Sequence, residues 1–132
     1  MKRTEQREHI FKLIFGADFN EEAEQGTQAE LYFEQIEGAT EKDMQDISEK
    51  AQKVVEKIDE IDAMINEHTT GWKTGRMNKV DLTILRLAVY EMKWDEDVPT
   101  GVAINEAVNL AKKYSSEDGA SFVNGVLAKL AD

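Results

Sequence analysis

The stretch LTILRLAVYEMKW, residues 82–94, decides the fold that this sequence predicts. Its apolar residues occupy nearly the whole circumference of a helix, a pattern typical of a helix at the centre of its domain. Asp81 stands directly before it and is expected to cap it. After the turn that contains Pro99, the apolar spacing of VAINEAVNLAKKY (102–114) predicts a second helix, and SFVNGVLAKL (121–130) predicts a last one after a break at SSEDGA.

The segments upstream of this stretch also have helical spacing. We expect helices over residues 4–15, 29–36 and 40–65, with Thr40 opening the last of these and Asp43 following three residues later. The sequence has a single Pro and few Gly inside the periodic segments. It therefore predicts an all-α fold, a helical bundle of six or seven helices in two groups that form one domain over residues 1–132.

Composition limits the classes of function. The chain has no Cys, which excludes disulfides, thiolate metal sites and a cysteine nucleophile. No apolar run reaches the roughly 18 residues of a membrane span, and the charged start does not fit a signal peptide, so we expect a cytoplasmic protein that binds no membrane. The net charge of −11 argues against a nucleic-acid binder acting alone and favours a basic protein partner.

Motifs for catalysis are lacking. The two histidines, His9 and His68, have no companion at metal-binding spacing, and GWKTGR (71–76) does not have the residue order of a phosphate-binding loop. Carboxylates are numerous, but carboxylates on helix faces are usually solvated. We therefore expect no enzyme activity, no metal and no cofactor.

Three polar residues and one glycine in the apolar helices need a structural reason. Arg86 lies in the most apolar helix, where a charge is costly unless it is paired, so we expect Arg86 to meet Glu106 or the Asn105 amide on the next helix. The alternative of a catalytic Glu–Arg pair lacks a nucleophile. Gly125 is expected to allow close packing, because a glycine inside a helix costs about 1 kcal/mol relative to alanine.

Several of these stretches together resemble a known family. ILRLAVYEM, the VP turn and VAINEAVNLAKKYSSEDGASFVNGVL follow the order and spacing of the C-terminal half of the NusB family of bacterial transcription antitermination factors. RxxxREHIFKLIFGADF (3–19) resembles the family's basic first helix, whereas residues 20–70 match in length and helicity alone.

The resemblance implies a non-enzymatic protein that pairs with NusE, a ribosomal small-subunit protein. The pair would bind the single-stranded boxA element of nascent transcripts, notably those of ribosomal RNA operons, and would act on the RNA polymerase elongation complex indirectly. By position, the RNA-contacting residues would be Lys2, Arg3, Arg7, Asp118 and Phe122. The residues that meet NusE would be Phe15, Phe19 and Asp81. Phenylalanines on an apolar stripe are more often core, so Phe15 and Phe122 have that alternative.

One departure from the family bears on affinity. Glu5 interrupts the basic start, and the chain as a whole is acidic, so we expect weak RNA binding alone and useful binding with NusE. Two other readings are a homodimeric helical module for protein docking and an accessory domain of an RNA cytosine methyltransferase. The second would need a Rossmann domain, for which the 132 residues leave no room.

Overall fold

The computed structural model describes residues 1–17, 39–69 and 73–131. Within these ranges the chain forms six α-helices and one short 3-10 helix, and no strand. The predicted all-α class is therefore confirmed. The helix expected over residues 29–36 lies outside the described ranges. The chain divides into two compact units, Met1–Glu56 and Lys57–Asp132.

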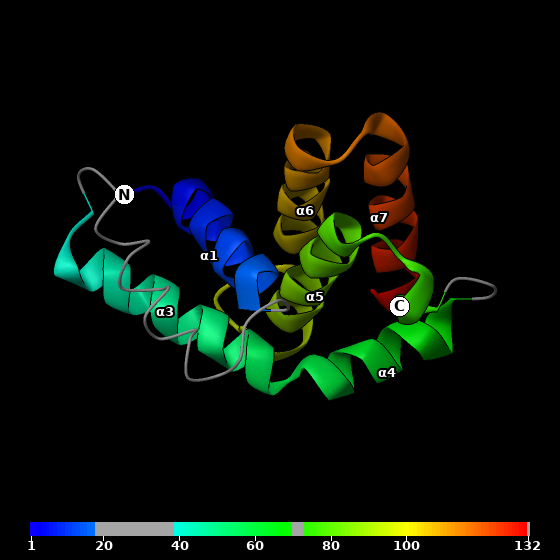
Figure 1. Cartoon of the computed structure of the whole chain (residues 1–132), viewed down its shortest axis with the longest axis horizontal. Coiled ribbons are helices and arrows are strands. Elements are labelled where there is room, and N and C mark those ends of the chain that lie inside the picture. The colour runs from blue at the N-terminus through cyan, green and yellow to red at the C-terminus, as the bar shows by residue number, and fades with distance from the viewer. Residues whose placement is uncertain (18–38, 70–72, 132) are drawn as a thin grey trace. The chain divides into compact units, whose positions relative to one another are not determined.

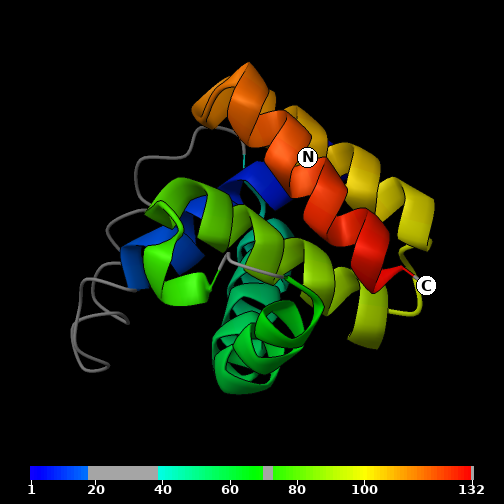
Figure 2. The same cartoon turned by 90° about the vertical axis from the view of Figure 1, so that its right-hand side faces the viewer.

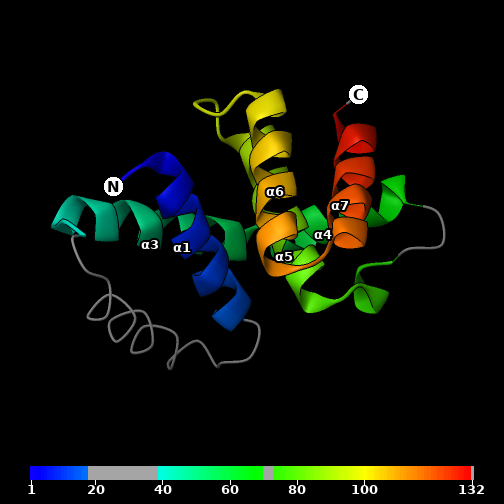
Figure 3. The same ribbon diagram turned by 90° about the horizontal axis from the view of Figure 1, so that it is seen from above.

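Among its described residues, the N-terminal unit contains the helices α1 (Arg3–Ala17) and α3 (Glu41–Glu56), which lie side by side (Figure 3). The apolar side chains that the sequence placed on one face of each helix are buried. On α1 and α3 these are Ile10, Phe11, Ile14, Ile47, Ala51 and Val54. Thr40 begins α3 as expected: its hydroxyl accepts a hydrogen bond from the Asp43 N–H at 3.0 Å, and the Asp43 carboxylate accepts one from the Thr40 N–H at 3.1 Å.

The long helix expected over residues 40–65 is two helices. A break at Lys57, where φ is −102° and ψ is 4°, separates α3 from α4 (Ile58–His68), and it coincides with the boundary between the two units. The apolar spacing continues through the break, and no Gly or Pro marks it. Periodicity alone could therefore not locate this boundary.

The C-terminal unit is arranged around α5 (Lys79–Trp94). Residues 81–91 are all buried, as the apolar circumference of this helix predicted. In this unit α5 packs against α4, α6 (Thr100–Tyr114) and α7 (Glu117–Leu130) (Figure 1). Figure 2 shows α6 and α7 running alongside each other, joined by a short turn. The 3-10 helix η1 (Thr74–Arg76) precedes α5.

Helices α5 and α7 begin about one turn earlier than predicted. The cap of α5 is Asn78 rather than Asp81: the Asn78 side chain accepts from the Asp81 N–H at 2.8 Å and donates to the Asp81 carboxylate at 2.8 Å. In α7, Ser116 caps the helix by accepting from the Gly119 N–H at 2.9 Å, so EDGA forms the first turn instead of a break. A small polar side chain followed by acidic residues is a common helix start, and this signal outweighs the glycine.

Candidate nucleic-acid interface

The basic start of α1 divides into exposed and buried positions. Lys2 and Arg3 are exposed to solvent, so their charged groups are accessible to a phosphate. Arg7, by contrast, is only 7 % exposed and already has polar or ionic interactions within the protein. Of the three predicted RNA-contacting residues at this end, Lys2 and Arg3 are therefore exposed and Arg7 is buried.

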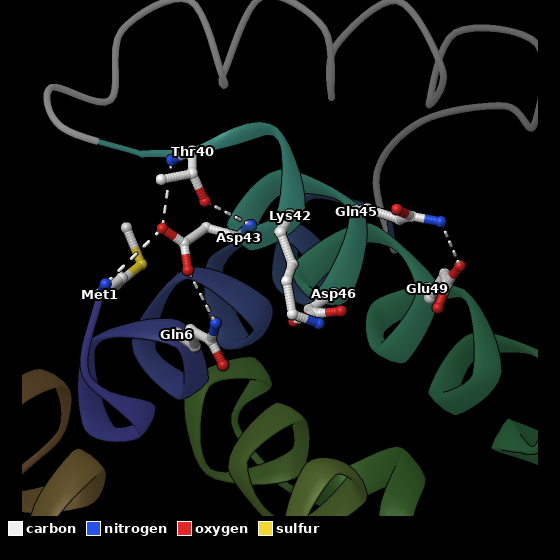
Figure 4. A network of polar contacts seen from close by, with 8 residues as sticks. All are labelled: Met1, Gln6, Thr40, Lys42, Asp43, Gln45, Asp46 and Glu49. Atoms are coloured by element: carbon white, nitrogen blue, oxygen red, sulfur yellow. Dashed lines mark hydrogen bonds and ion pairs between the residues drawn. The ribbon is translucent and has the colours of Figure 1, made fainter.

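A polar network centred on Asp43 holds this end of α1 against α3 (Figure 4). The Asp43 carboxylate accepts a hydrogen bond from the Gln6 side-chain amide at 3.1 Å and lies 3.6 Å from the amino group of Met1. The pKa of Asp43 is lowered from its usual 3.8, chiefly by the hydrogen bond from the Thr40 N–H. Desolvation raises this pKa, but the Thr40 hydroxyl, Gln6 and the positive charge of Met1 lower it further. These contacts hold Met1 and Gln6, which flank Lys2 and Arg3 in the sequence, against the start of α3.

The second predicted contact region lies at the end of α6 and the start of α7, which we call the α6–α7 edge. Asp118 is exposed in the first turn of α7, and Phe122 one turn later is half-buried, so it is neither a full core residue nor a freely projecting ring. Lys112 and Lys113 in the last turn of α6 are also exposed, and the Lys113 ammonium lies 5.5 Å from the Tyr114 ring centroid. These lysines were not among the predicted RNA-contacting residues, although the KKY triplet just before SSEDGASF is a signal in the sequence.

The predicted partner-contacting residues differ in their surroundings. Phe15 is half-buried, with its ring centroid 6.2 Å from that of Phe11. Phe19 lies outside the described residues. Asp81 is only 5 % exposed in the first turn of α5, so a docking protein could touch little of it. Phe15 is thus the predicted partner contact that has accessible surface in the described ranges.

The partner assigned to Arg86 was wrong. The carboxylate that pairs with the buried guanidinium is Asp62 of α4, with Nε to Oδ1 at 2.9 Å and Nη2 to Oδ2 at 2.8 Å. Asn105 is exposed, and Glu106 is half-buried with interactions of its own. The expectation of a charged partner was sound, but helical spacing does not tell which neighbouring helix supplies it.

The reason given for Gly125 was also wrong. Gly125 is exposed, and a Cβ added there would meet nothing within 4 Å. The glycine that does sit in a crowded place is Gly119, six residues earlier on the same helix. In the sequence, Gly119 falls within SSEDGA, which was expected to be a helix break and not part of a packed helix.

Among the described residues no group of His, Cys, Asp or Glu could hold a metal ion, and no helix is long and apolar enough to cross a membrane. His9 has a pKa lowered from 6.5, first by partial burial and then by the charge of Lys12, which outweigh the opposing pull of Glu8 and Glu5. A lowered pKa on a single histidine does not make a catalytic site without a neighbouring nucleophile.

Comparisons with known proteins agree on one family. The NusB family model matches residues 4–132. The transcription antitermination protein NusB of Agathobacter rectalis is 50 % identical over 131 residues, covering 99 % of this chain and all of the relative. NusB of T. maritima superposes with a TM-score of 0.85 at 30 % identity, covering 99 % of this chain and 91 % of that one. A crystal structure of antitermination factors NusB and NusE in complex with dsRNA contains a chain that superposes with a TM-score of 0.81 at 25 % identity, covering 99 % and 98 %.

Proposed function

The chain belongs to the NusB family, and on that premise we propose that it is a transcription antitermination factor that pairs with NusE and binds boxA RNA. The observation that carries this proposal is the match over residues 4–132, together with a relative that is 50 % identical over its full length. The chain acts as a single domain in the cytoplasm, on nascent transcripts such as those of ribosomal RNA operons, and reaches RNA polymerase through the assembled complex. Its work is binding, and it catalyses no reaction.

In this proposal the RNA lies on two groups of side chains. Lys2 and Arg3 contact phosphates, because exposed cations at a helix start are placed to do so without reading sequence. At the α6–α7 edge the partly exposed ring of Phe122 stacks on an unpaired base, and Asp118 accepts hydrogen bonds from base edges. The exposed Lys112 and Lys113 add positive charge at the end of α6.

The buried Arg7 has a different part. A guanidinium that is 7 % exposed and has interactions within the protein contributes chiefly by supporting α1, and any contact with RNA would use its remaining exposed edge. We therefore expect Lys2 and Arg3 to carry most of the salt dependence of RNA binding at this end of the chain.

The acidic surface explains why a second protein is needed. At a net charge of −11 the chain repels RNA at long range, and a basic partner both neutralises that field and supplies its own phosphate contacts. Phe15 provides an apolar contact for NusE, as does Phe19 by resemblance. The complex of this chain with NusE binds RNA more tightly than either protein alone, because the RNA-binding surfaces of both proteins contact the same RNA molecule.

The proposal is tested with purified protein and the cognate NusE. Isothermal titration calorimetry and light scattering should show a one-to-one complex, and Phe122→Ala should weaken binding of single-stranded boxA RNA to that complex by about 5- to 150-fold, the range for losing one stacked base. Phe122→Trp, which keeps an aromatic face, is the matched control and should bind within a fewfold of the original chain. A duplex of the same sequence is included because the similar solved complex contains dsRNA.

Two results would refute the proposal. One is the absence of a complex with NusE. The other is a stable homodimer that excludes NusE, which would favour the docking-module reading.

A further inference from the structure

Gly119 occupies a crowded position in the first turn of α7. Its N–H donates to the Ser116 hydroxyl at 2.9 Å, and the residue is buried. A Cβ at this position would overlap the Ser115 hydroxyl, lie 3.1 Å from the Ser115 Cβ and lie 2.9 Å from Asp81 Oδ1. Rotation can move the Ser115 hydroxyl away, but the Ser115 Cβ is fixed to the backbone. The first turn of α7 therefore fits against Ser115 and Asp81 because residue 119 has no side chain.

Asp81 is the other half of this contact, and it has little room to move. Its Oδ2 accepts from the Asn78 side chain, its N–H donates back to Asn78, and the residue is 5 % exposed. Oδ1 is buried and has no hydrogen-bond donor. The carboxylate lies in the first turn of α5 and beside the first turn of α7, and the partial positive charge at these two helix starts stabilises its negative charge.

We propose that Asp81, Ser115 and Gly119 form a junction that sets the position of the first turn of α7, and through it the RNA-contacting Asp118 and Phe122. The expected effect on RNA binding rests on the proposed function, whereas the junction itself rests on the contacts described above. Asp118 directly precedes Gly119, and Phe122 follows it by three residues, so both move with that turn. Gly119 and Asp81 are positioning residues, which need not touch RNA themselves.

This assignment differs from a role for Asp81 at the surface that meets NusE. A buried carboxylate that acts through α7 should change RNA affinity when it is removed, while the affinity for NusE stays the same. Removal of a carboxylate that contacts NusE should lower the affinity for NusE and leave the affinity for RNA unchanged. The two roles of Asp81 are therefore separable by measuring both affinities in one variant.

The first test is Gly119→Ala, with Gly125→Ala as the matched control on the same helix, where an added Cβ meets nothing. Amide chemical shifts of the full chain should move from Ser115 through Phe122 in Gly119→Ala and should stay unchanged there in Gly125→Ala. RNA affinity of the NusE complex should fall about tenfold for Gly119→Ala, an effect of the size of one misplaced base contact, with NusE affinity within about twofold. Ser115→Gly combined with Gly119→Ala removes the overlap with Ser115 and keeps the close approach to Asp81 Oδ1, so it should restore the chemical shifts and the RNA affinity in part.

Asp81→Ala keeps the inference testable if Gly119→Ala does not fold. Hydrogen exchange of the α7 first-turn amides should quicken in Asp81→Ala, and RNA affinity should fall while NusE affinity is kept. Unchanged α7 amides in both variants would overturn the junction, as would a loss of NusE affinity alone in Asp81→Ala. An original chain that fails to bind RNA with NusE would refute the proposed function instead, and the α7 amides would still decide whether the junction exists.

Discussion

Arg86 and Asp62 form a bidentate ion pair that joins α5 to α4 within the C-terminal unit. Both contacts are short, 2.9 Å for Nε to Oδ1 and 2.8 Å for Nη2 to Oδ2, and the Arg86 side chain is 8 % exposed. The planar guanidinium matches the carboxylate in one orientation, so the pair fixes how the two helices are aligned. It explains how the most apolar helix of the chain accommodates an arginine.

Breaking this pair should destabilise the protein strongly. Asp62→Ala removes the carboxylate that accepts two hydrogen bonds from the buried guanidinium and should lower the free energy of unfolding by about 3 kcal/mol, measured by urea denaturation. Arg86→Met together with Asp62→Leu removes both charges and should cost less than Asp62→Ala alone. If Arg86→Met and Asp62→Ala both left stability unchanged, the pair would not be a lock between these helices.

The capping hydroxyl of Thr40 should be worth a measurable amount of stability. Thr40→Ala removes the acceptor for the Asp43 N–H at the start of α3 and should cost about 1 kcal/mol of unfolding free energy. Thr100→Ala is the control, because the start of α6 has no side-chain cap and Thr100 is exposed. Equal losses in the two variants would argue against the capping role of Thr40.

Acid should weaken the network around Asp43. The pKa of Asp43 is lower in the folded chain than its usual 3.8, chiefly because the carboxylate accepts from the Thr40 N–H, so the folded state favours the ionised form. The resulting stabilisation is complete above pH 3.8 and is lost as the pH falls from there through the folded-state pKa. The melting temperature of Asp43→Asn should therefore change less with pH over this range than that of the original chain, and parallel curves would contradict the assignment.

The sequence predicted the helices well where the apolar spacing was long and regular. The central position of residues 82–94 and the Thr40 start of the third helix are clear examples, because a helix that is apolar all round has to be buried and a hydroxyl cap is a local signal. The break at Lys57 could not be predicted, since the spacing continues through it and no Gly or Pro stands there.

The site was predicted less completely than the fold. The family resemblance implies that Lys2, Arg3 and Phe122 contact RNA, which stays a prediction. Whether a side chain is exposed depends on tertiary packing, which encloses Arg7 and Asp81. The partner of Arg86 is 24 residues away on another helix, a distance that periodicity does not address. Gly119 and Gly125 look alike in the sequence, and only the positions of Ser115 and Asp81 distinguish them.

Gly125 should be replaceable with a gain in stability. An exposed glycine inside α7 carries the usual helix-interior cost, and the space beside it is open, so Gly125→Ala should raise the free energy of unfolding by up to about 1 kcal/mol. Thermal and urea unfolding measure the effect. A loss of stability would mean that residue 125 is crowded after all.

The exposed cations at the start of α1 should set part of the salt dependence of RNA binding. Lys2→Ala and Arg3→Ala should each lower the slope of log affinity against log salt by about 1 for the complex with NusE, since each removes one phosphate contact. Lys42→Ala, which removes an exposed lysine that pairs with Asp46 on α3, serves as the control and should leave the slope unchanged. Unchanged slopes in the first two variants would remove this end of α1 from the RNA interface.

We expect this acidic chain to bind RNA as one half of a complex with NusE. Fluorescence anisotropy of a labelled single-stranded boxA RNA, with and without NusE and at two salt concentrations, tests it most directly. We predict weak binding by the chain alone, strong binding when NusE is added, and a marked loss of affinity at the higher salt. Tight binding without NusE, or no binding when NusE is present and the protein is folded, would contradict the account.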